Sequence, residues 1–267
     1  MIIFKSINKL NKEVNFKAKI GFVPTMGALH KGHISLIKYS KKIWKKTMVS
    51  IFINPSQFNK INDFKKYPKN IEKDISILKN LKVDYLLTPE TNEVYRGKKY
   101  KKIKLSKKNK IMCAYYRPGH FEGVLGVINQ FLLRFKPQYI FFGEKDYQQL
   151  FLIKNFIKKK FKTKVLSHPT IRDNNKVALS SRNNLLNKNS IKKSSVISNL
   201  LFKFKNELRN NIANKKSLIN IISNINTIKD IKIEYLEIRN KYNFLKNYNQ
   251  NNFKIFLAYY NKKIRLI

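Results

Sequence analysis

The fold is decided by residues 20–37, which read Ile-Gly-Phe-Val-Pro-Thr-Met-Gly-Ala-Leu-His-Lys-Gly-His-Ile-Ser-Leu-Ile. An apolar run opens this stretch, and Pro24 ends it because proline has no N–H to give to a strand ladder. The glycines that follow permit tight turns and a close approach of a ligand to the backbone. After His33, apolar residues recur at helical spacing with lysines between them. The stretch therefore predicts a strand, a glycine-containing turn and a helix, with His30 and His33 where the helix begins.

The same stretch predicts a phosphate site. The first turn of a helix carries unpaired N–H groups and the positive end of the helix dipole, so it attracts anions. His30-Lys31-Gly32-His33 adds two imidazoles, and both rings could donate hydrogen bonds to triphosphate oxygens. A preorganised donor aimed at the charge that grows as pyrophosphate leaves is worth ~3–4 kcal/mol of barrier. The alternative is a pair of surface histidines near a helix start.

The whole chain has the length and composition of a globular protein. Its 267 residues suffice for one large domain or two modest ones, at roughly 100–200 residues each. No apolar run reaches the ~20 residues of a membrane helix, and we expect no signal peptide at the start. Cys113 is the single cysteine, which excludes an internal disulfide framework. These features favour a cytoplasmic enzyme.

The formal net charge of +42 has two interpretations. It would suit a protein that binds nucleic-acid phosphates. However, lysine is spread through every segment and is over-used together with asparagine and isoleucine, which is typical of a coding sequence biased toward A and T. We therefore do not expect nucleic acid as a main partner, although a positive field would help an enzyme attract anionic substrates.

Short apolar segments alternate with amphipathic ones over the first two thirds of the chain. This alternation predicts an α/β, Rossmann-like fold, in which a parallel sheet has helices on both faces. Ligands of such sheets collect beyond the carboxyl ends of the strands. We predict strands at 20–23, 47–53, 83–88, 139–142 and 164–167, and helices after 33, at 70–82, at 124–135 and up to about 160.

The pattern changes near residue 170. Two helices are predicted within 187–226, and they are followed by strands at 231–238, 253–260 and 264–267. We therefore expect a larger domain, 1–170, that binds the substrates, and a smaller C-terminal α+β domain, 171–267, that closes over the active site.

Two further motifs have the chemistry of a nucleotide site. Gly143-Glu144-Lys145-Asp146 follows a predicted strand. Lys145 could neutralise phosphate there, and Asp146 could orient the Lys145 side chain or a ribose. The plainer alternative is a solvated charged turn. Ser180-Ser181-Arg182 offers two hydroxyls and a fork-shaped cation that suit phosphate, although such triplets are common on surfaces. The sequence contains no P-loop, no dinucleotide fingerprint and no zinc-ligand spacing.

Single polar residues are weaker candidates. Gln57 and Gln149 could hold a polar uncharged substrate, or could equally face solvent. Asp74 could contact magnesium, or could be a surface charge on its helix. His120 is balanced between a site role and local packing, whereas His168, before a proline, is expected to be structural.

Taken in order, these motifs resemble those of the pantothenate synthetase family, the pantoate–β-alanine ligases of the HxGH nucleotidylyltransferase superfamily. The resemblance is dense from residue 20 to about 183 and thinner beyond. It is carried by the ordered motifs Pro24–His33, Phe52–Phe58, Tyr67-Pro68, Arg117–Phe121, Gly143–Leu150 and Ala178–Asn183.

The resemblance implies an ATP-dependent ligase that condenses (R)-pantoate with β-alanine. Pantoate would first attack the α-phosphate of ATP to give pantoyl adenylate and pyrophosphate. The amine of β-alanine would then displace AMP to give pantothenate. The family also implies Mg²⁺ as a cofactor, a cytoplasmic location and a homodimer.

The resemblance also implies roles for individual residues. His33 would be the proton donor, with His30 and Lys145 as the other catalytic residues. Pantoate would contact Gln57 and Gln149, with Asn54 and Arg117 close by. Asp74 would contact magnesium. ATP would contact Met26, Gly27, Ala28, Leu29, His30, Lys31, Gly32, His33, Gly143, Glu144, Lys145, Asp146, Ile171, Leu179, Ser180, Ser181 and Arg182.

The sequence departs from the family pattern before Arg117, where Cys113-Ala114-Tyr115-Tyr116 is bulkier than usual. Two other functions stay open at this point. One is a basic RNA-binding protein that keeps an adenylyltransferase fold without catalysis. The other is an adenylyltransferase that stops at a dinucleotide product, although no second nucleotide motif favours it.

Overall fold

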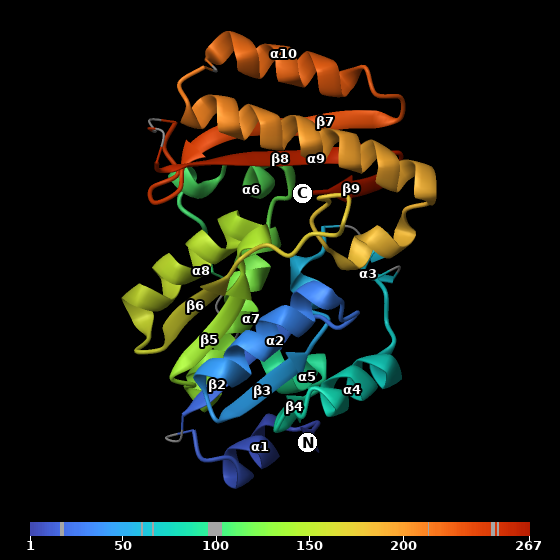
Figure 1. The fold of residues 1–267 in the computed structure, drawn as a ribbon. Helices are drawn as coiled ribbons and strands as arrows, with labels where there is room; N and C mark the ends of the chain where they lie inside the picture. The colour runs from blue at the N-terminus through green and yellow to red at the C-terminus, as the bar shows by residue number, and fades with distance from the viewer. Residues whose placement is uncertain are drawn as a thin grey trace. The chain divides into compact units, whose positions relative to one another are not determined.

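The computed structural model describes residues 1–16, 19–59, 61–65, 67–95, 103–212, 214–246, 249 and 251–267. The chain forms two compact units, Met1–Thr170 and Ile171–Ile267 (Figure 1). Each unit has its own sheet and its own hydrophobic core. Among the described residues, no helix is long and apolar enough to cross a membrane.

The first unit is built on a six-stranded sheet with the strand order β1-β4-β3-β2-β5-β6. All paired strands in this sheet run parallel. From β2 the chain moves outward through β3 to β4, and it later returns to place β5 on the other side of β2. The strands are β1 (Ile2–Phe4), β2 (Ile20–Thr25), β3 (Lys46–Ile51), β4 (Tyr85–Leu87), β5 (Tyr139–Gly143) and β6 (Lys164–His168).

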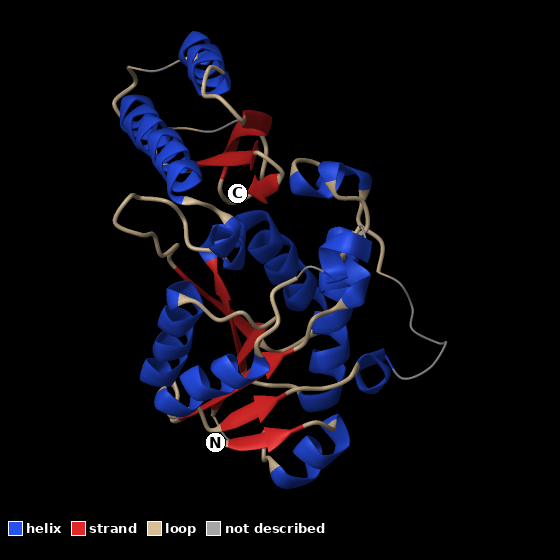
Figure 2. Ribbon diagram, turned by 90° about the vertical axis from the view of Figure 1, so that its right-hand side faces the viewer, coloured by secondary structure: helices blue, strands red, loops and turns tan. Residues whose placement is uncertain are grey.

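Helices lie on both sides of this sheet (Figure 2). They are α1 (Ile7–Glu13), α2 (Lys31–Ile43), α3 (Ile61–Lys65), α4 (Ile71–Asn80), α5 (Thr91–Tyr95), α6 (Cys113–Tyr116), α7 (His120–Phe135) and α8 (Tyr147–Lys160). Short 3₁₀ turns complete the unit at η1 (Pro55–Gln57), η2 (Lys107–Asn109) and η3 (Glu144–Asp146).

Strand β2 is buried on both faces. Val23 joins the cluster formed with α2 and α4, whereas Phe22 packs edge-on against Phe131 and Phe135 of α7 at ring-centroid distances of 5.7 and 5.1 Å. Successive side chains of a strand point to opposite faces, so a central parallel strand needs an unbroken apolar run. This burial explains the run from Ile20 to Val23 and confirms the predicted fold class for this part of the chain.

Two local predictions for this unit are wrong. Strand β2 does not end at Pro24 but continues to Thr25. The carbonyl of Thr25 accepts from Phe52 N–H at 3.0 Å, so Thr25 faces β3 and its neighbour Pro24 faces β5. Pairing with β5 involves only Gly21 and Phe22, so Pro24 has no ladder bond to lose. The sequence analysis also missed β1, a three-residue edge strand in the lysine-rich start of the chain.

The second unit is an α+β structure, as predicted. Its sheet is antiparallel with the order β7-β8-β9, and its core is formed by residues such as Ile197, Ile225 and Leu236. Its elements are η4 (Ser181–Leu185), α9 (Lys188–Arg209), α10 (Lys215–Asn226), β7 (Ile231–Asn240), β8 (Phe253–Asn261) and β9 (Ile264–Leu266).

Candidate active site

The candidate site of the first unit lies where the strand order reverses. The chain moves one way from β2 and the other way from β5, so the loops after these neighbouring strands diverge, and parallel α/β sheets commonly bind ligands at such a point. The His-x-Gly-His loop follows β2 at Thr25, and the Gly-Glu-Lys-Asp turn follows β5 at Gly143. The topology therefore brings together two motifs that are more than a hundred residues apart in the sequence.

The loop between β2 and α2 is held in an unusual backbone conformation. Gly27 has a φ of +78° and Ala28 a φ of +51°, a region that a residue with a side chain rarely adopts. The Thr25 hydroxyl accepts from Gly27 N–H at 3.2 Å and donates to Ser50 C=O at 2.8 Å, which ties the loop to β3. A conformation of this kind persists only when its surroundings over-determine it.

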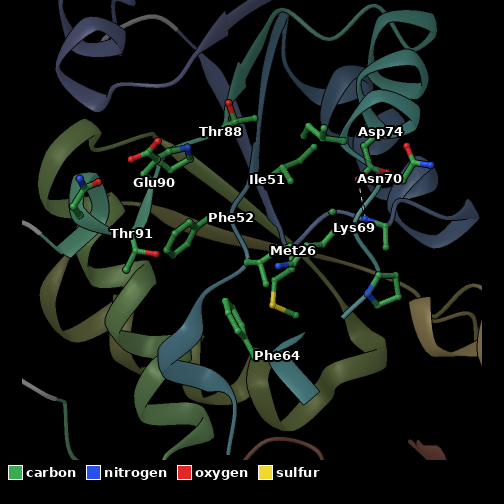
Figure 3. A pocket seen from close by; sticks show the side chains of 17 residues that line it. Met26, Ile51, Phe52, Phe64, Lys69, Asn70, Asp74, Thr88, Glu90 and Thr91 are labelled. Carbon is green, nitrogen blue, oxygen red and sulfur yellow. Dashed lines mark hydrogen bonds between the residues drawn. The ribbon is translucent and has the colours of Figure 1, made fainter. Parts of the chain in front are cut away.

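Asp74 of α4 supplies the strongest of these restraints. Its carboxylate accepts from Ala28 N–H and from Leu29 N–H, both at 2.8 Å, and the residue is only 3% exposed. Figure 3 shows Asp74 beside this loop. The alternative that Asp74 is a surface charge is therefore wrong. Each carboxylate oxygen of Asp74 already accepts one backbone N–H. A direct contact of Asp74 with magnesium stays a prediction.

His30 and His33 are fixed by hydrogen bonds from the backbone. His30 is the N-cap of α2, and its Nδ1 accepts from Gly32 N–H at 3.1 Å. The Nδ1 of His33 accepts from His30 N–H at 3.3 Å, and the two ring centroids are 4.1 Å apart. Because Nδ1 is the acceptor in both rings, a neutral ring must carry its proton on Nε2. Each imidazole therefore has an Nε2–H that can be donated to a ligand.

Both rings are neutral at pH 7. Burial lowers the pKa of His33 to about 3, and the adjacent His30 lowers it further while Asp146 opposes the shift. Burial also lowers the pKa of His30 to about 4, with Lys145 as the next cause. At pH 7 the two rings can therefore donate hydrogen bonds but carry no positive charge.

The prediction that the backbone N–H groups at the start of α2 are unpaired is mostly wrong, and the loop before the helix is paired in the same way. The N–H groups of Gly27, Ala28, Leu29, His30 and Gly32 all donate to acceptors within the protein. The acceptors are a threonine hydroxyl, the Asp74 carboxylate and the Nδ1 atoms of the two histidines. An anion at this position would therefore meet imidazole N–H groups in place of backbone ones.

The Gly-Glu-Lys-Asp turn faces the histidines from β5. Lys145 and Asp146 lie in η3, where the Lys145 ammonium is 3.6 Å from the Asp146 carboxylate. The positive charge of Lys145 lowers the pKa of His30, and the negative charge of Asp146 opposes that shift. Gln149 is half-buried in the first turn of α8, directly after this turn. That Lys145 and the two histidines serve one site stays a prediction.

Gln57 joins the site from η1, after β3. It is 7% exposed, and its Nε2 donates to the Met26 sulfur at 2.8 Å. Asn54 donates to Gln57 Oε1 at 3.2 Å and to Gly123 C=O at 3.1 Å. Its own Oδ1 accepts from Tyr95 OH at 2.7 Å. Asn54 therefore holds the Gln57 amide in place, and its contact with substrate stays a prediction.

The sequence model of the family described as pantoate-beta-alanine ligase matches residues 2–267. The chain belongs to this family. It is 39% identical over 266 residues to the pantothenate synthetase of Francisella tularensis subsp. mediasiatica, an alignment that spans 98% of this chain and 93% of the relative. The predicted resemblance is confirmed.

Solved structures of pantothenate synthetases have the same fold. The enzyme from Thermus thermophilus superposes with a TM-score of 0.93 at 28% identity, covering 100% of this chain and 97% of that one. The pantoate–β-alanine ligase of Francisella tularensis, solved in complex with β-γ ATP and β-alanine, has a TM-score of 0.85 at 37% identity, with 100% and 95% coverage. This chain is therefore an ATP-dependent ligase of pantoate and β-alanine.

Several residues predicted for the ligase site belong to the second unit. Ile171 and Leu179 pair through Leu179 N–H and Ile171 C=O at 3.0 Å, at the base of a short hairpin. Ser180 is the N-cap of η4, and its hydroxyl donates to Asn183 Oδ1 at 2.6 Å. Ser181 and Arg182 lie within η4. That these residues contact ATP stays a prediction.

A cavity of about 800 Å³ lies on the Asp74 side of the His-x-Gly-His loop (Figure 3). Met26, Gly27 and Ala28 form one wall, and residues from the ends of β3 and β4 form others. None of the described residues His30, His33, Gln57 and Gln149 lines it. The cavity therefore adjoins Asp74 and part of the predicted ATP-binding loop, but not these four side chains.

Sequence reasoning found the motifs of this ligase site but not the residues that position them. Asp74 lies 46 positions along the sequence from Ala28, whose N–H it accepts. Tyr95 lies 41 positions from Asn54, to which it donates. Nothing in the local pattern indicates these partners. The signal that could have found Asp74 is its place on the apolar side of the first turn of α4, whose other acidic residue, Glu72, is exposed.

Proposed function

We propose that this ligase makes pantothenate in two steps at the carboxyl ends of β2 and β5. A carboxylate oxygen of pantoate attacks the α-phosphorus of ATP, and the bond to pyrophosphate breaks. The amine of β-alanine then attacks the acyl carbon of pantoyl adenylate, and AMP leaves. The observation that carries this proposal is the pair of neutral imidazoles whose Nδ1 atoms accept backbone N–H groups, so that each ring has an Nε2–H to donate.

His30 and His33 stabilise the charge that develops on the phosphate oxygens. Their orientation is set before substrate binds, because each Nδ1 is already engaged with the backbone. Preorganised donors in a partly buried site stabilise a transition state without reorganising. The family role of His33 as a proton donor thus takes the form of hydrogen-bond donation from Nε2.

Lys145 supplies the positive charge that two approaching anions require. Its ammonium stays near the histidines, where it also helps to keep His30 neutral. Gln57 and Gln149 bind pantoate through amide groups, which suit the hydroxyl groups of that substrate. Arg117 binds a substrate carboxylate, a group for which guanidinium is well matched.

The second unit completes the enzyme by closing over the first. Ser180, Ser181 and Arg182 contact the phosphates, and Ile171 and Leu179 contact ATP. Closure excludes water, which would otherwise hydrolyse the adenylate. We place the enzyme in the cytoplasm as a homodimer.

Mg²⁺ accompanies ATP in this proposal. The described residues contain no group of three or more His, Cys, Asp or Glu that could hold a metal ion. Mg²⁺ is commonly bound by substrate phosphates, water and one or two carboxylates rather than by a protein cage.

Product analysis tests the proposed function. With ATP, (R)-pantoate and β-alanine present, we expect equal amounts of AMP, pyrophosphate and pantothenate. Omission of β-alanine should leave pantoate-dependent exchange of pyrophosphate into ATP. Formation of ADP, or nucleotide cleavage that does not require pantoate, would contradict the proposal.

A further inference from the structure

His120, the first residue of α7, lies beside the predicted pantoate site and has no role in the steps above. It is 8% exposed. Its Nδ1 is 2.8 Å from the backbone carbonyl of Gln57, and its Nε2 is 2.9 Å from an Nη atom of Arg117. One buried ring therefore connects two residues that the proposed function assigns to substrate binding.

These two partners determine the tautomer of His120. A carbonyl oxygen can only accept a hydrogen bond, so Nδ1 must carry a proton. A guanidinium can only donate, so Nε2 must present its lone pair to Arg117. The ring is therefore neutral and protonated on Nδ1, the opposite of His30 and His33, whose Nδ1 atoms are acceptors. A protonated ring would set an N–H against the Arg117 N–H.

The first turn of α7 holds the backbone of η1 at several points. In addition to the bond from His120, Asn54 donates to Gly123 C=O at 3.1 Å. A Cβ atom on Gly123 would lie 2.3 Å from Ser56 O and 2.8 Å from Gln57 N, so the two backbones are in direct contact there. The backbone of Gln57 consequently has no room to shift toward α7, and His120 fixes the direction of its carbonyl.

We propose that His120 is a positioning residue of the pantoate site, which aligns the Gln57 amide and the Arg117 guanidinium through its two ring nitrogens. Its Nδ1–H fixes the Gln57 backbone, from which the substrate-binding amide extends. Its Nε2 orients the guanidinium. This inference rests on the proposed roles of Gln57 and Arg117.

Substitutions that imitate one nitrogen at a time separate these tasks. The amide of His120→Asn can replace Nδ1 and donate to the Gln57 carbonyl, whereas the amide oxygen of His120→Gln can replace Nε2 and accept from Arg117. His120→Ala loses both bonds. We expect His120→Ala to raise KM for pantoate about tenfold or more, with KM for ATP changed by less than about twofold. His120→Asn should restore most of the lost pantoate affinity.

The contradicting results are specific. An unchanged KM for pantoate in His120→Ala would overturn the inference, and so would an equal rise in KM for ATP. Gln57→Ala is measured in parallel. If Gln57→Ala leaves KM for pantoate unchanged, Gln57 does not bind pantoate, and the part of the inference in which His120 acts through Gln57 fails with it. If wild-type protein shows no pantoate-dependent release of pyrophosphate, the proposed function itself fails.

A spectroscopic measurement tests the inference independently of activity. Long-range ¹H–¹⁵N spectra of the full chain labelled at its histidines distinguish a ring protonated on Nδ1 from one protonated on Nε2. We expect an Nδ1–H ring at pH 7 that disappears from the spectrum of His120→Asn. A spectrum in which the signal lost on this substitution is an Nε2–H ring or a charged ring would overturn the proposal.

Discussion

At the scale of single residues, the chemistry of this ligase depends on which histidine nitrogen carries the proton. His30 and His33 accept at Nδ1, because backbone N–H groups of their own loop are directed at these atoms, and a neutral ring then carries its proton on Nε2. The sequence indicates both imidazoles and their place before a helix. It does not indicate their charge, because the pKa of both rings is lowered mainly by burial, and that of His30 next by Lys145, which lies in η3 after β5.

The donor role of His33 can be tested with a pair of substitutions. The amide of His33→Gln retains an N–H near the position of Nε2, whereas His33→Ala has no donor. We expect His33→Ala to lower kcat about 10²–10³-fold and His33→Gln to retain clearly more activity, since a lost preorganised donor costs about 3–4 kcal/mol. Steady-state release of pyrophosphate provides the measurement. Equal activity of wild type and His33→Ala would remove His33 from the mechanism.

The lowered pKa of His33 also predicts a loss of stability in acid. Between pH 6.5 and pH 3 the unfolded ring binds a proton that the folded ring, with its pKa of about 3, does not. Unfolding is therefore favoured as the pH falls through this range. At about pH 4.5 the cost relative to pH 7 is about 2–3 kcal/mol for this residue.

Urea unfolding of wild type and His33→Gln at the two pH values isolates this contribution. Other groups titrate in both proteins and cancel in the difference. We expect the wild type to lose about 2–3 kcal/mol more than the variant on acidification. Equal losses in the two proteins would show that His33 is not held neutral.

At the scale of elements, the site is formed by loops that other elements hold in place. Helix α4 restrains the loop before α2 through Asp74, and the first turn of α7 restrains η1. The strands and helices themselves follow from apolar spacing, and most were predictable, including β3, β5, α7 and α9. The short edge strand β1 was not predictable, because an alternating pattern cannot be recognised in only three residues. The restraints between elements were equally hidden, since they depend on pairs of residues far apart in the sequence.

The restraint by α4 predicts the effect of Asp74→Asn. Its amide oxygen can accept only one of the two loop N–H groups well, and its NH₂ group opposes the other. We expect a loss of stability of about 1–3 kcal/mol and a kcat lowered about tenfold or more. The matched control is Glu72→Gln, which removes an exposed charge from the same helix. If both variants behave alike, the loop does not depend on Asp74.

At the scale of the whole molecule, the sequence indicated the fold class, the family and the reaction. It did so because the motifs after β2 and β5 occur in the same order as in the family. The strand order explains why motifs separated in the sequence serve one site. The proposed contacts of Ser180–Arg182 with the phosphates require the proposed closure of the second unit, which no local pattern specifies. The excess of 57 basic over 15 acidic residues is a property of the chain as a whole and is not needed by the chemistry of the site.

This excess charge predicts a stability that depends on salt. Like charges repel in the compact state, and added salt screens them. We expect the Tm to rise by about 5 °C or more between about 20 mM and about 300 mM NaCl. Choline chloride of equal ionic strength should give the same rise if screening is the cause. A Tm that does not change with salt would show that the charges are spread widely enough not to matter.

The central claim is that the carboxylate of pantoate attacks the α-phosphorus of ATP at this site. Pantoate labelled with ¹⁸O in its carboxylate tests this claim most directly, with mass spectrometry of the AMP produced in a complete reaction with β-alanine. We predict that each AMP carries one ¹⁸O, because the bond between pantoate oxygen and phosphorus formed in the first step survives the second. AMP without ¹⁸O, or label found in pyrophosphate, would contradict it.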